Sequence, residues 1–361
     1  MQKIICGSDS IKQVSSILQN FGCSKFLLVC DSSYPFLNIK EQIDSLPFER
    51  VVFNGFTSNP LYEDVCRGVE LFNREGCDTI VAVGGGSAID VAKCVKLYSK
   101  MDSSKNYITQ EYTDTGIPLI AIPTTAGTGS ESTRYAVIYF EGKKQSVTHE
   151  SIIPNYAVLD SSVLKTLPIY QKKCTMLDAL CQGIESWWSV NSTDESKGYA
   201  KQAVRMILEN MDTYLAGSDK AAEQIMLAAN YAGRAINITQ TTAPHAMSYK
   251  LTSMYKLPHG HAVAVCLPEV WGYMLTHMDN CVDERGEGYL KATLDEIAEL
   301  ITPATFRNIL QKLEMKYPSS KDKTNDLIIL TNSVNPVRLK NNPVPLDESV
   351  IRSLYERSLK S

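Results

Sequence analysis

The stretch "TIVAVGGGSAIDVAK", residues 79–93, decides the fold. It begins as an apolar, β-branched run, which is typical of a buried parallel strand, and continues through three glycines into a helix-forming segment. Glycines let backbone amides approach an anion, and the N-terminus of the new helix favours negative charge. Although the spacing is not G-x-G-x-x-G, the turn is suited to a pyrophosphate through Gly84, Gly85, Gly86 and Ser87. A tight turn with only a structural role is the alternative.

Strands and helices alternate through the first half of the chain. Apolar runs predict further buried strands at 25–31, 51–53, 117–125 and 155–160, and an amphipathic helix at 62–76. This alternation implies a parallel sheet covered on both faces. Residues 134–149 differ, because two extended runs flank Glu141-Gly142 and predict a hairpin.

Long helical windows dominate after about residue 165, at 170–189, 197–217 and 220–239. The length also suggests two domains, since one domain usually has roughly 100–200 residues. The sequence therefore predicts an α/β dinucleotide-binding domain over residues 1–165 and an all-helical domain over residues 166–361.

Composition excludes several classes of function. The chain has 36 basic and 40 acidic residues and a pI near 5.8, which argues against the basic face of a nucleic-acid binder. No apolar run is long enough to predict a membrane span, and the N-terminus does not read as a signal peptide. None of the ten cysteines forms a Cys-x-x-Cys pair, so we expect reduced thiols in a cytoplasmic protein.

Two further segments follow predicted strands, where ligands of parallel sheets bind. Asp31 follows the first strand, and a carboxylate there can bind a ribose and repel a 2′-phosphate, which favours NAD over NADP. A helix N-cap is its alternative role. The loop "IPTTAGTGSES" offers small and hydroxyl-bearing residues to phosphate, ribose or nicotinamide: Thr124, Thr125, Gly127 and Thr128.

A metal site is predicted further along the chain. Asp178 and Gln182 are one helical turn apart, and a carboxylate in this apolar setting needs a partner such as a metal ion. His245 and His259 offer two imidazoles. One Asp and two His with an open fourth position suit a catalytic zinc or Fe(II). Alternatively, His245 is a core histidine and His259 a helix cap.

Four motifs follow one another along the chain: "GGGSAIDVAK" (84–93), "PTTAGTGSE" (123–131), "DALCQGIES" (178–186) and "PHAMSYKLTSMYKLPHGHA" (244–262). Together they resemble the iron-containing (group III) alcohol dehydrogenases, whose superfamily includes glycerol dehydrogenase and dehydroquinate synthase. The resemblance implies a Rossmann-like cofactor domain, a helical metal domain and a homodimer.

The same resemblance implies roles for individual residues. It assigns contacts with NAD(H) to Asp31, the glycine turn, Asp90, Thr124, Thr125, Thr128 and Lys144, the last at the nicotinamide ribose. It assigns an Fe²⁺ or Zn²⁺ ion to Asp178, His245 and His259.

Two positions depart from the family pattern. Gln182 stands where the iron enzymes usually carry a histidine, so it is either a weaker amide ligand or leaves the metal with three protein ligands, as in glycerol dehydrogenase. Tyr249 replaces a histidine near the nicotinamide. We expect it to relay a proton, bind substrate or only pack.

Within the superfamily, the variant motifs look most like the phosphonoacetaldehyde reductases. This implies reduction of a small phosphonate aldehyde by NADH. Such a substrate needs a cation in its site, and Arg134, just after the threonine-rich loop, is the first candidate, because a guanidinium can bind the anion through two hydrogen bonds. An ion pair is the alternative role of Arg134. Other functions left open are a dehydrogenase for a neutral alcohol or polyol, a dehydroquinate synthase-like lyase, and a nucleotide-binding protein without catalysis.

Overall fold

A computed structural model describes residues 2–360, which divide into two units. Residues 1 and 361, included in the predicted domain ranges, lie outside the described residues. The sheet unit runs up to Pro168 and adds Asp212–Gly233, and the helical unit comprises Ile169–Met211 and the chain from Arg234 onward. Two long helices therefore contribute to both units, α6 (Asp194–Leu215) and α7 (Asp219–Thr239).

A parallel sheet forms the centre of the sheet unit. Among the described residues, six strands pair in the order β1-β8-β5-β4-β2-β3. Their bounds are Lys3–Cys6 (β1), Lys25–Cys30 (β2), Glu49–Phe53 (β3), Thr79–Gly84 (β4), Leu119–Pro123 (β5) and Tyr156–Leu159 (β8). β2 pairs with β3 on one side and with β4 on the other. The direction of winding therefore reverses between β2 and β4, which is the topological switch point where such sheets bind ligands.

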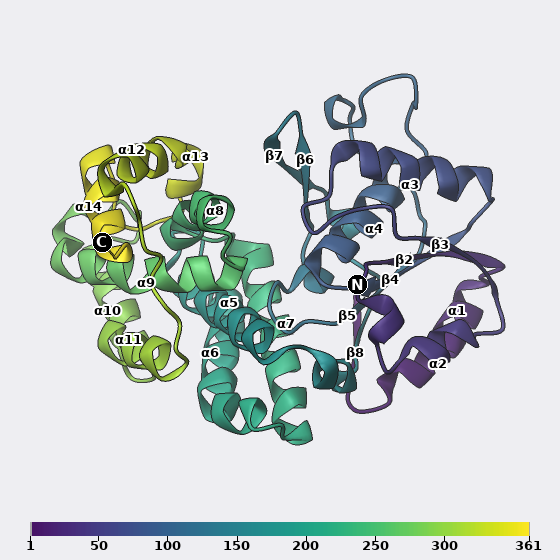
Figure 1. The fold of residues 1–361 in the computed structure, drawn as a ribbon, viewed down its shortest axis with the longest axis horizontal. Coiled ribbons are helices and arrows are strands. Elements are labelled where there is room, and N and C mark those ends of the chain that lie inside the picture. Colours follow the sequence, from purple (N-terminus) through teal and green to yellow (C-terminus); the bar gives the residue numbers. More distant parts are fainter. Residues whose placement is uncertain (1, 361) are drawn as a thin grey trace. The chain divides into compact units, whose positions relative to one another are not determined.

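Each face of the sheet is covered, as parallel sheets require. Leu27 and Val29 of β2 belong to a core shared with α3 (Tyr62–Arg74) and α4 (Gly86–Tyr98). Phe26 and Leu28 point to the opposite face by strand alternation and are also fully buried. Figure 1 shows α3 and α4 on one side of the strands, and α1 (Val14–Phe21) and α2 (Lys40–Asp44) on the other. The predicted α/β fold class is confirmed.

The strands and the hairpin match the sequence prediction with one exception. β6 (Tyr135–Phe140) and β7 (Lys143–Thr148) pair antiparallel, and both residues between them have positive φ, as a tight hairpin turn needs. β1 was not predicted. It has four residues at the sheet edge and no fully buried side chain, so its apolar pattern is weak, and its pairing partner β8 lies some 150 residues away.

Short 3-10 helices occupy several connections of this unit: Ser10–Gln13 (η1), Tyr34–Phe36 (η2), Tyr107–Thr109 (η3), Ser130–Ser132 (η4), Glu150–Ile152 (η5) and Ser161–Thr166 (η6).

The helical unit is built around α5, α8 and α9. The bounds are Ile169–Trp188 (α5), Ala243–Tyr255 (α8), His259–Thr276 (α9), Met278–Asn280 (η7), Glu287–Ala298 (α10), Pro303–Lys312 (α11), Lys323–Ser333 (α12), Pro336–Leu339 (α13) and Glu348–Ser358 (α14). α9 is buried continuously from Gly260 to Trp271 and packs against both α5 and α8. The unit contains no named strand among its described residues, which confirms its helical class.

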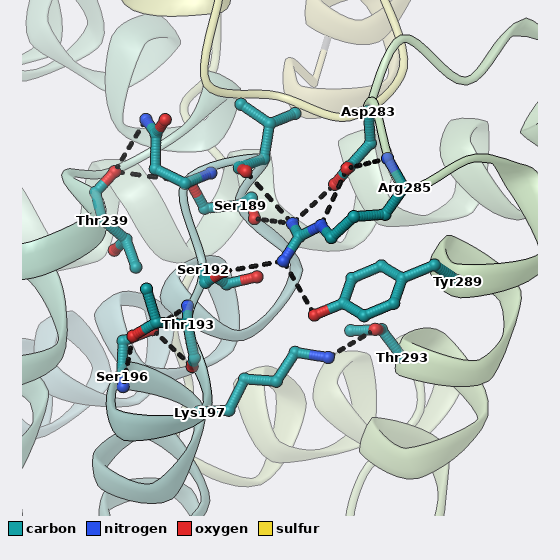
Figure 2. A network of polar contacts seen from close by, with 12 residues as sticks. Ser189, Ser192, Thr193, Ser196, Lys197, Thr239, Asp283, Arg285, Tyr289 and Thr293 are labelled. Atoms are coloured by element: carbon teal, nitrogen blue, oxygen red, sulfur yellow. Dashed lines mark hydrogen bonds and ion pairs between the residues drawn. The ribbon is translucent and has the colours of Figure 1, made fainter.

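A polar network fixes the chain just beyond the C-terminal end of α5 (Figure 2). Arg285 donates through Nη1 to the carbonyl of Ser192 at 2.6 Å and to the hydroxyl of Tyr289 at 2.8 Å. Its Nη2 donates to the carbonyl of Ser189 at 3.1 Å and to the buried carboxylate of Asp283 at 2.6 Å. One guanidinium thereby joins two carbonyls of the segment after α5 to a buried carboxylate.

Two expectations from composition can be checked on this fold. All ten cysteines lie in the described part and are free, as expected for reduced thiols. Within residues 2–360, every helix falls short of the length or apolar character that crossing a membrane requires.

Candidate nucleotide site and metal centre

The glycine turn lies at the switch point of the sheet, against Asp31. β4 ends at Gly84, and α4 starts two residues later. Gly84 has φ +158°, and a Cβ there would lie 2.6 Å from the Cβ of Ala88 and 2.8 Å from Oδ2 of Asp31. The amide of Gly85 points at the same oxygen at 3.4 Å. Glycine at position 84 is therefore required for the carboxylate and the turn to approach each other.

Asp31 also organises the loop that follows β2. Its Oδ1 accepts hydrogen bonds from the amide of Ser33 at 2.8 Å and from the hydroxyl of Ser33 at 2.5 Å. This is an Asx-type turn rather than a cap of a long helix. The side chain thus combines a local structural role with a place at the ligand-binding edge of the sheet.

The threonine-rich loop after β5 packs on the glycine turn. The amide of Thr124 donates to the carbonyl of Gly84 at 3.0 Å. A Cβ on Gly86 would lie 3.0 Å from Oγ1 of Thr128, and Thr125 is half-buried in the same loop. The two loops that the sequence put forward therefore meet, so that hydroxyls flank the N-terminus of α4. This arrangement suits a pyrophosphate.

Ser87 and Asp90 bind protein groups in this structure. Ser87 donates to the carbonyl of Ser58 at 2.6 Å. Asp90 accepts hydrogen bonds from the hydroxyl of Ser130 at 2.6 Å and from the amide of Val137 at 2.9 Å, and it thereby ties α4 to the threonine-rich loop and β6. Burial raises the pKa of this carboxyl.

The two cations predicted for this half of the chain lie on or beside the hairpin. Lys144 is half-buried on β7, opposite Tyr139. Arg134 precedes β6, and its Nη1 lies 2.5 Å from Oε1 of Glu150. The ion pair weighed as the alternative role of Arg134 is therefore present.

The three predicted metal ligands come together in the helical unit. Asp178 lies on α5, His245 on α8, and His259 is the first residue of α9. One donor atom from each lies within 4.8 Å of the other two. Oδ1 of Asp178 is 3.4 Å from Nε2 of His245 and 4.0 Å from Nε2 of His259. These donors converge as ligands of one divalent ion do.

Glu185 fixes the ring of His245. Its Oε1 pairs with Nδ1 of His245, and its Oε2 accepts hydrogen bonds from the amide and the hydroxyl of Thr242 at 2.8 and 2.9 Å. Burial alone lowers the pKa of His245, but the charges of Glu185 and Asp178 outweigh it and raise the pKa to about 10. With no metal charge to oppose them, the two carboxylates thus attract a proton to this ring.

The buried Nε2 of His245 makes no hydrogen bond within residues 2–360. A bound metal would use the lone pair of this atom, while Glu185 would hold the proton on the other ring nitrogen. The chemistry of the donor set and this buried ring nitrogen therefore fit a divalent metal.

Gly260 explains how His259 comes close to Asp178. A Cβ at position 260 would lie 2.0 Å from the carbonyl oxygen of Cys174 and 2.8 Å from the Cβ of Asp178. Only glycine allows the first turn of α9 to pack directly on the backbone of α5.

Gln182 and Tyr249, the two departures from the family pattern, lie on the helices of the triad. Gln182 is buried one turn after Asp178 on α5. Tyr249 lies on α8, and its ring stacks on His259 with centroids 5.6 Å apart and planes 6° apart. Tyr249 therefore lines the predicted metal centre on the side of His259.

His261, the third histidine of this segment, is structural. Its Nδ1 shares a hydrogen bond with the hydroxyl of Tyr170 at 2.7 Å, and its Nε2 lies 2.9 Å from the carbonyl of Lys316. Both ring nitrogens are therefore occupied by the protein.

Two residues of this region were missed by reasoning from the sequence. Glu185 lies seven residues after Asp178, hence on the same face of α5, and this spacing could have pointed to it. Arg338 on α13 donates to the hydroxyl of Tyr249 at 2.9 Å. No local sequence pattern predicts this contact, because its two residues are 89 positions apart.

Comparisons with known proteins agree with this geometry. The family model for iron-containing alcohol dehydrogenases matches residues 1–161, and the model for the C-terminal part of that family matches residues 173–359. The chain is 37% identical to the probable alcohol dehydrogenase EutG of Salmonella typhimurium over 59% of the chain and 56% of that relative. It is 33% identical to a phosphonoacetaldehyde reductase of Streptomyces viridochromogenes over 78% of the chain and 76% of the relative. It is 31% identical to an NAD-dependent methanol dehydrogenase of Bacillus methanolicus over 75% and 74%, respectively.

Solved structures show the same fold. A 1,3-propanediol oxidoreductase superposes with a TM-score of 0.87 at 26% identity, covering 98% of this chain and 97% of that one. An iron-containing alcohol dehydrogenase of Thermococcus thioreducens also gives 0.87, at 24% identity over 99% and 98%.

Proposed function

The chain belongs to the iron-containing alcohol dehydrogenase family, whose members are oxidoreductases acting on alcohols, and we propose that it reduces phosphonoacetaldehyde to 2-hydroxyethylphosphonate with NADH. The observation that carries the metal-dependent part is the convergence of Asp178, His245 and His259. In this reaction the aldehyde takes a hydride from NADH and a proton, which yields the alcohol and NAD⁺.

We assign the cofactor to residues 1–165 and the metal to residues 166–361. Support for NAD(H) comes from the glycine turn at the N-terminus of α4, which suits a pyrophosphate, and from Asp31 at the switch point. A carboxylate at this place accepts hydrogen bonds from a ribose and repels a 2′-phosphate, so NAD is favoured over NADP. The name of the methanol dehydrogenase relative agrees with this choice. Lys144 is proposed to contact the nicotinamide ribose.

We assign an Fe²⁺ or Zn²⁺ ion to Asp178, His245 and His259, with Gln182 as the candidate fourth ligand. When bound, such an ion supplies a Lewis acid that polarises the aldehyde carbonyl. Glu185 keeps a proton on Nδ1 of His245, so that Nε2 offers its lone pair to the metal. Asp178 would supply an anionic oxygen ligand, since its Oδ1 lies 3.4 Å from Nε2 of His245.

Tyr249 is proposed to deliver the proton. Its ring stacks on His259, and its hydroxyl accepts a hydrogen bond from Arg338. A phenol hydroxyl can give its proton to a developing alkoxide that lies within hydrogen-bond reach. Replacement by Phe is expected to lower kcat and change its pH profile, which a role in packing alone would leave unmoved.

The substrate class rests on one relative and therefore has a competitor. The phosphonoacetaldehyde reductase is 33% identical over 78% of the chain, and the methanol dehydrogenase, which is named for a neutral alcohol, is 31% identical over 75%. Arg134 is the cation that the sequence predicts for the phosphonate, although it already forms an ion pair with Glu150.

Assembly as a homodimer and a cytoplasmic location complete the proposal. Mass measurement in solution tests the first, and fractionation of the cells that make the protein tests the second.

The test is NADH oxidation by the full-length protein loaded with Fe²⁺ or with Zn²⁺. We expect the highest kcat/KM with phosphonoacetaldehyde, a lower value with propanal, and no rate without metal. A higher kcat/KM with propanal would favour the neutral alcohol. Absence of NADH oxidation with either aldehyde, after metal loading confirmed by elemental analysis, would contradict the proposed reaction.

A further inference from the structure

Arg338 is a half-buried cation beside the proposed metal centre. Its guanidinium carbon lies 5.0 Å from the centre of the Tyr249 ring, and its Nη1 donates to the hydroxyl of that ring at 2.9 Å. The Tyr249 ring also stacks on His259. A single side chain therefore connects the guanidinium to a predicted metal ligand.

The charge of Arg338 has no carboxylate partner among the described residues. Within residues 2–360 its polar contacts are the hydroxyl and the ring of Tyr249, and no carboxylate lies at ion-pair distance. A guanidinium has five N–H donors, so most of them remain for a ligand. Arg134, by contrast, already has Glu150 at 2.5 Å.

We propose that Arg338 binds the anionic group of the substrate and sets the preference for anionic over neutral aldehydes. This inference rests on the proposed function and names the residue that gives it selectivity. A phosphonate presents oxygen pairs that match the planar guanidinium fork. In a two-carbon aldehyde only one carbon lies between the carbonyl and the phosphonate. Because the metal would bind the carbonyl end, the cation that binds the phosphonate must lie close to the metal.

Tyr249 has a separate role toward Arg338. Its hydroxyl accepts one N–H of the guanidinium and holds the group beside the ring, while the charge itself belongs to Arg338. Loss of the hydroxyl would therefore remove a positioning contact and leave the charge. Loss of the guanidinium would remove the anion partner and leave the stacked ring.

The experiment compares kcat/KM for phosphonoacetaldehyde and propanal in the metal-loaded, full-length protein. We expect Arg338→Ala to raise KM for phosphonoacetaldehyde about 10- to 100-fold, the range for a lost charge-assisted hydrogen bond, and to change KM for propanal less than about 3-fold. Arg338→Lys should restore part of the difference, because it keeps the charge but not the fork. Tyr249→Phe should lower the ratio of the two kcat/KM values less than Arg338→Ala does, because it removes a positioning contact and leaves the charge.

Arg134→Ala is the matched control, and it should retain the wild-type ratio. Equal losses with both aldehydes in Arg338→Ala would make the residue structural and overturn the inference. A ratio lost in Arg134→Ala and kept in Arg338→Ala would place the anion contact at Arg134 instead. A wild-type protein without preference for the phosphonate would overturn the proposed substrate itself, whereas a preference that survives Arg338→Ala overturns only the role of Arg338.

Discussion

Two polar clusters lie at helix α5, one just beyond its C-terminal end and one in its middle. They differ in whether protein groups complete their hydrogen bonds. Beyond its C-terminal end, Arg285 joins the carbonyls of Ser189 and Ser192 to Asp283, and every contact is with another protein group (Figure 2). In its middle, Asp178 lies beside His245, whose buried Nε2 makes no hydrogen bond within the described chain.

This difference separates a cluster that holds the fold from one that takes a ligand. A buried polar network completed by protein groups contributes to the free energy of unfolding whatever else is bound. In the second cluster the donor atoms repel one another or attract protons unless an ion joins them. Its contribution to the free energy of unfolding therefore depends on the metal concentration. Four substitutions test this contrast.

His245→Ala should have the largest effect. It removes a predicted ligand, and loss of several kcal/mol of Lewis-acid stabilisation corresponds to a fall in kcat/KM on the order of 10³-fold. Elemental analysis should find little bound metal, and the melting temperature should no longer rise when Fe²⁺ or Zn²⁺ is added. Stoichiometric metal in this variant would contradict the assignment.

Gly260→Ala should have the second-largest effect. The added methyl group would lie 2.0 Å from a backbone carbonyl oxygen of α5, so α9 has to move away from Asp178. Overpacking of this kind costs about 1–3 kcal/mol or more of unfolding free energy, and bound metal should fall with it. Gly198→Ala on α6 is the control, because among the described residues no atom beyond its chain neighbours and the backbone of its own helix lies within 4 Å of the added Cβ. Alanine also favours the helix by roughly 1 kcal/mol. Equal denaturation midpoints for the two variants would contradict the close packing.

Arg285→Ala tests the closed cluster. The partly exposed guanidinium leaves behind several carbonyls and the buried carboxylate of Asp283, for which we expect a loss of about 2 kcal/mol in unfolding free energy. Urea denaturation measures this loss. Metal content per folded chain should stay at the wild-type value, and a lowered content would show that the two clusters are coupled.

Glu185→Gln should have the smallest effect of the four. The amide keeps the size of the side chain but removes the charge that holds a proton on Nδ1 of His245, and changes of this kind typically weaken metal affinity about 10- to 100-fold. A metal titration measures the shift. Unchanged affinity would mean that Glu185 only supports Thr242.

Much of the fold followed from local sequence patterns. Strands such as β2 and β4 are buried on both faces, so their apolar runs were easy to recognise, and the hairpin turn was signalled by Glu141-Gly142. The edge strand β1 was not recognised, because its four residues become a strand only through pairing with β8.

The candidate sites were predictable to a smaller extent. The glycine and threonine loops could be placed together because both follow parallel strands, and the structure brings them into contact. Spacing alone could not choose between a metal site and a core histidine for His245, and the motif resemblance made that choice. Arg338 escaped prediction because its contact with Tyr249 depends on how α13 packs on α8.

Removal and return of the metal test the central claim most directly. The wild-type protein is treated with a chelator, its metal content is measured, and NADH oxidation with phosphonoacetaldehyde is followed before and after addition of Fe²⁺ or Zn²⁺. We predict that the rate disappears with the metal and returns with about one ion per chain. A metal-free protein that keeps its full rate would contradict the assignment of Asp178, His245 and His259 as a catalytic metal centre.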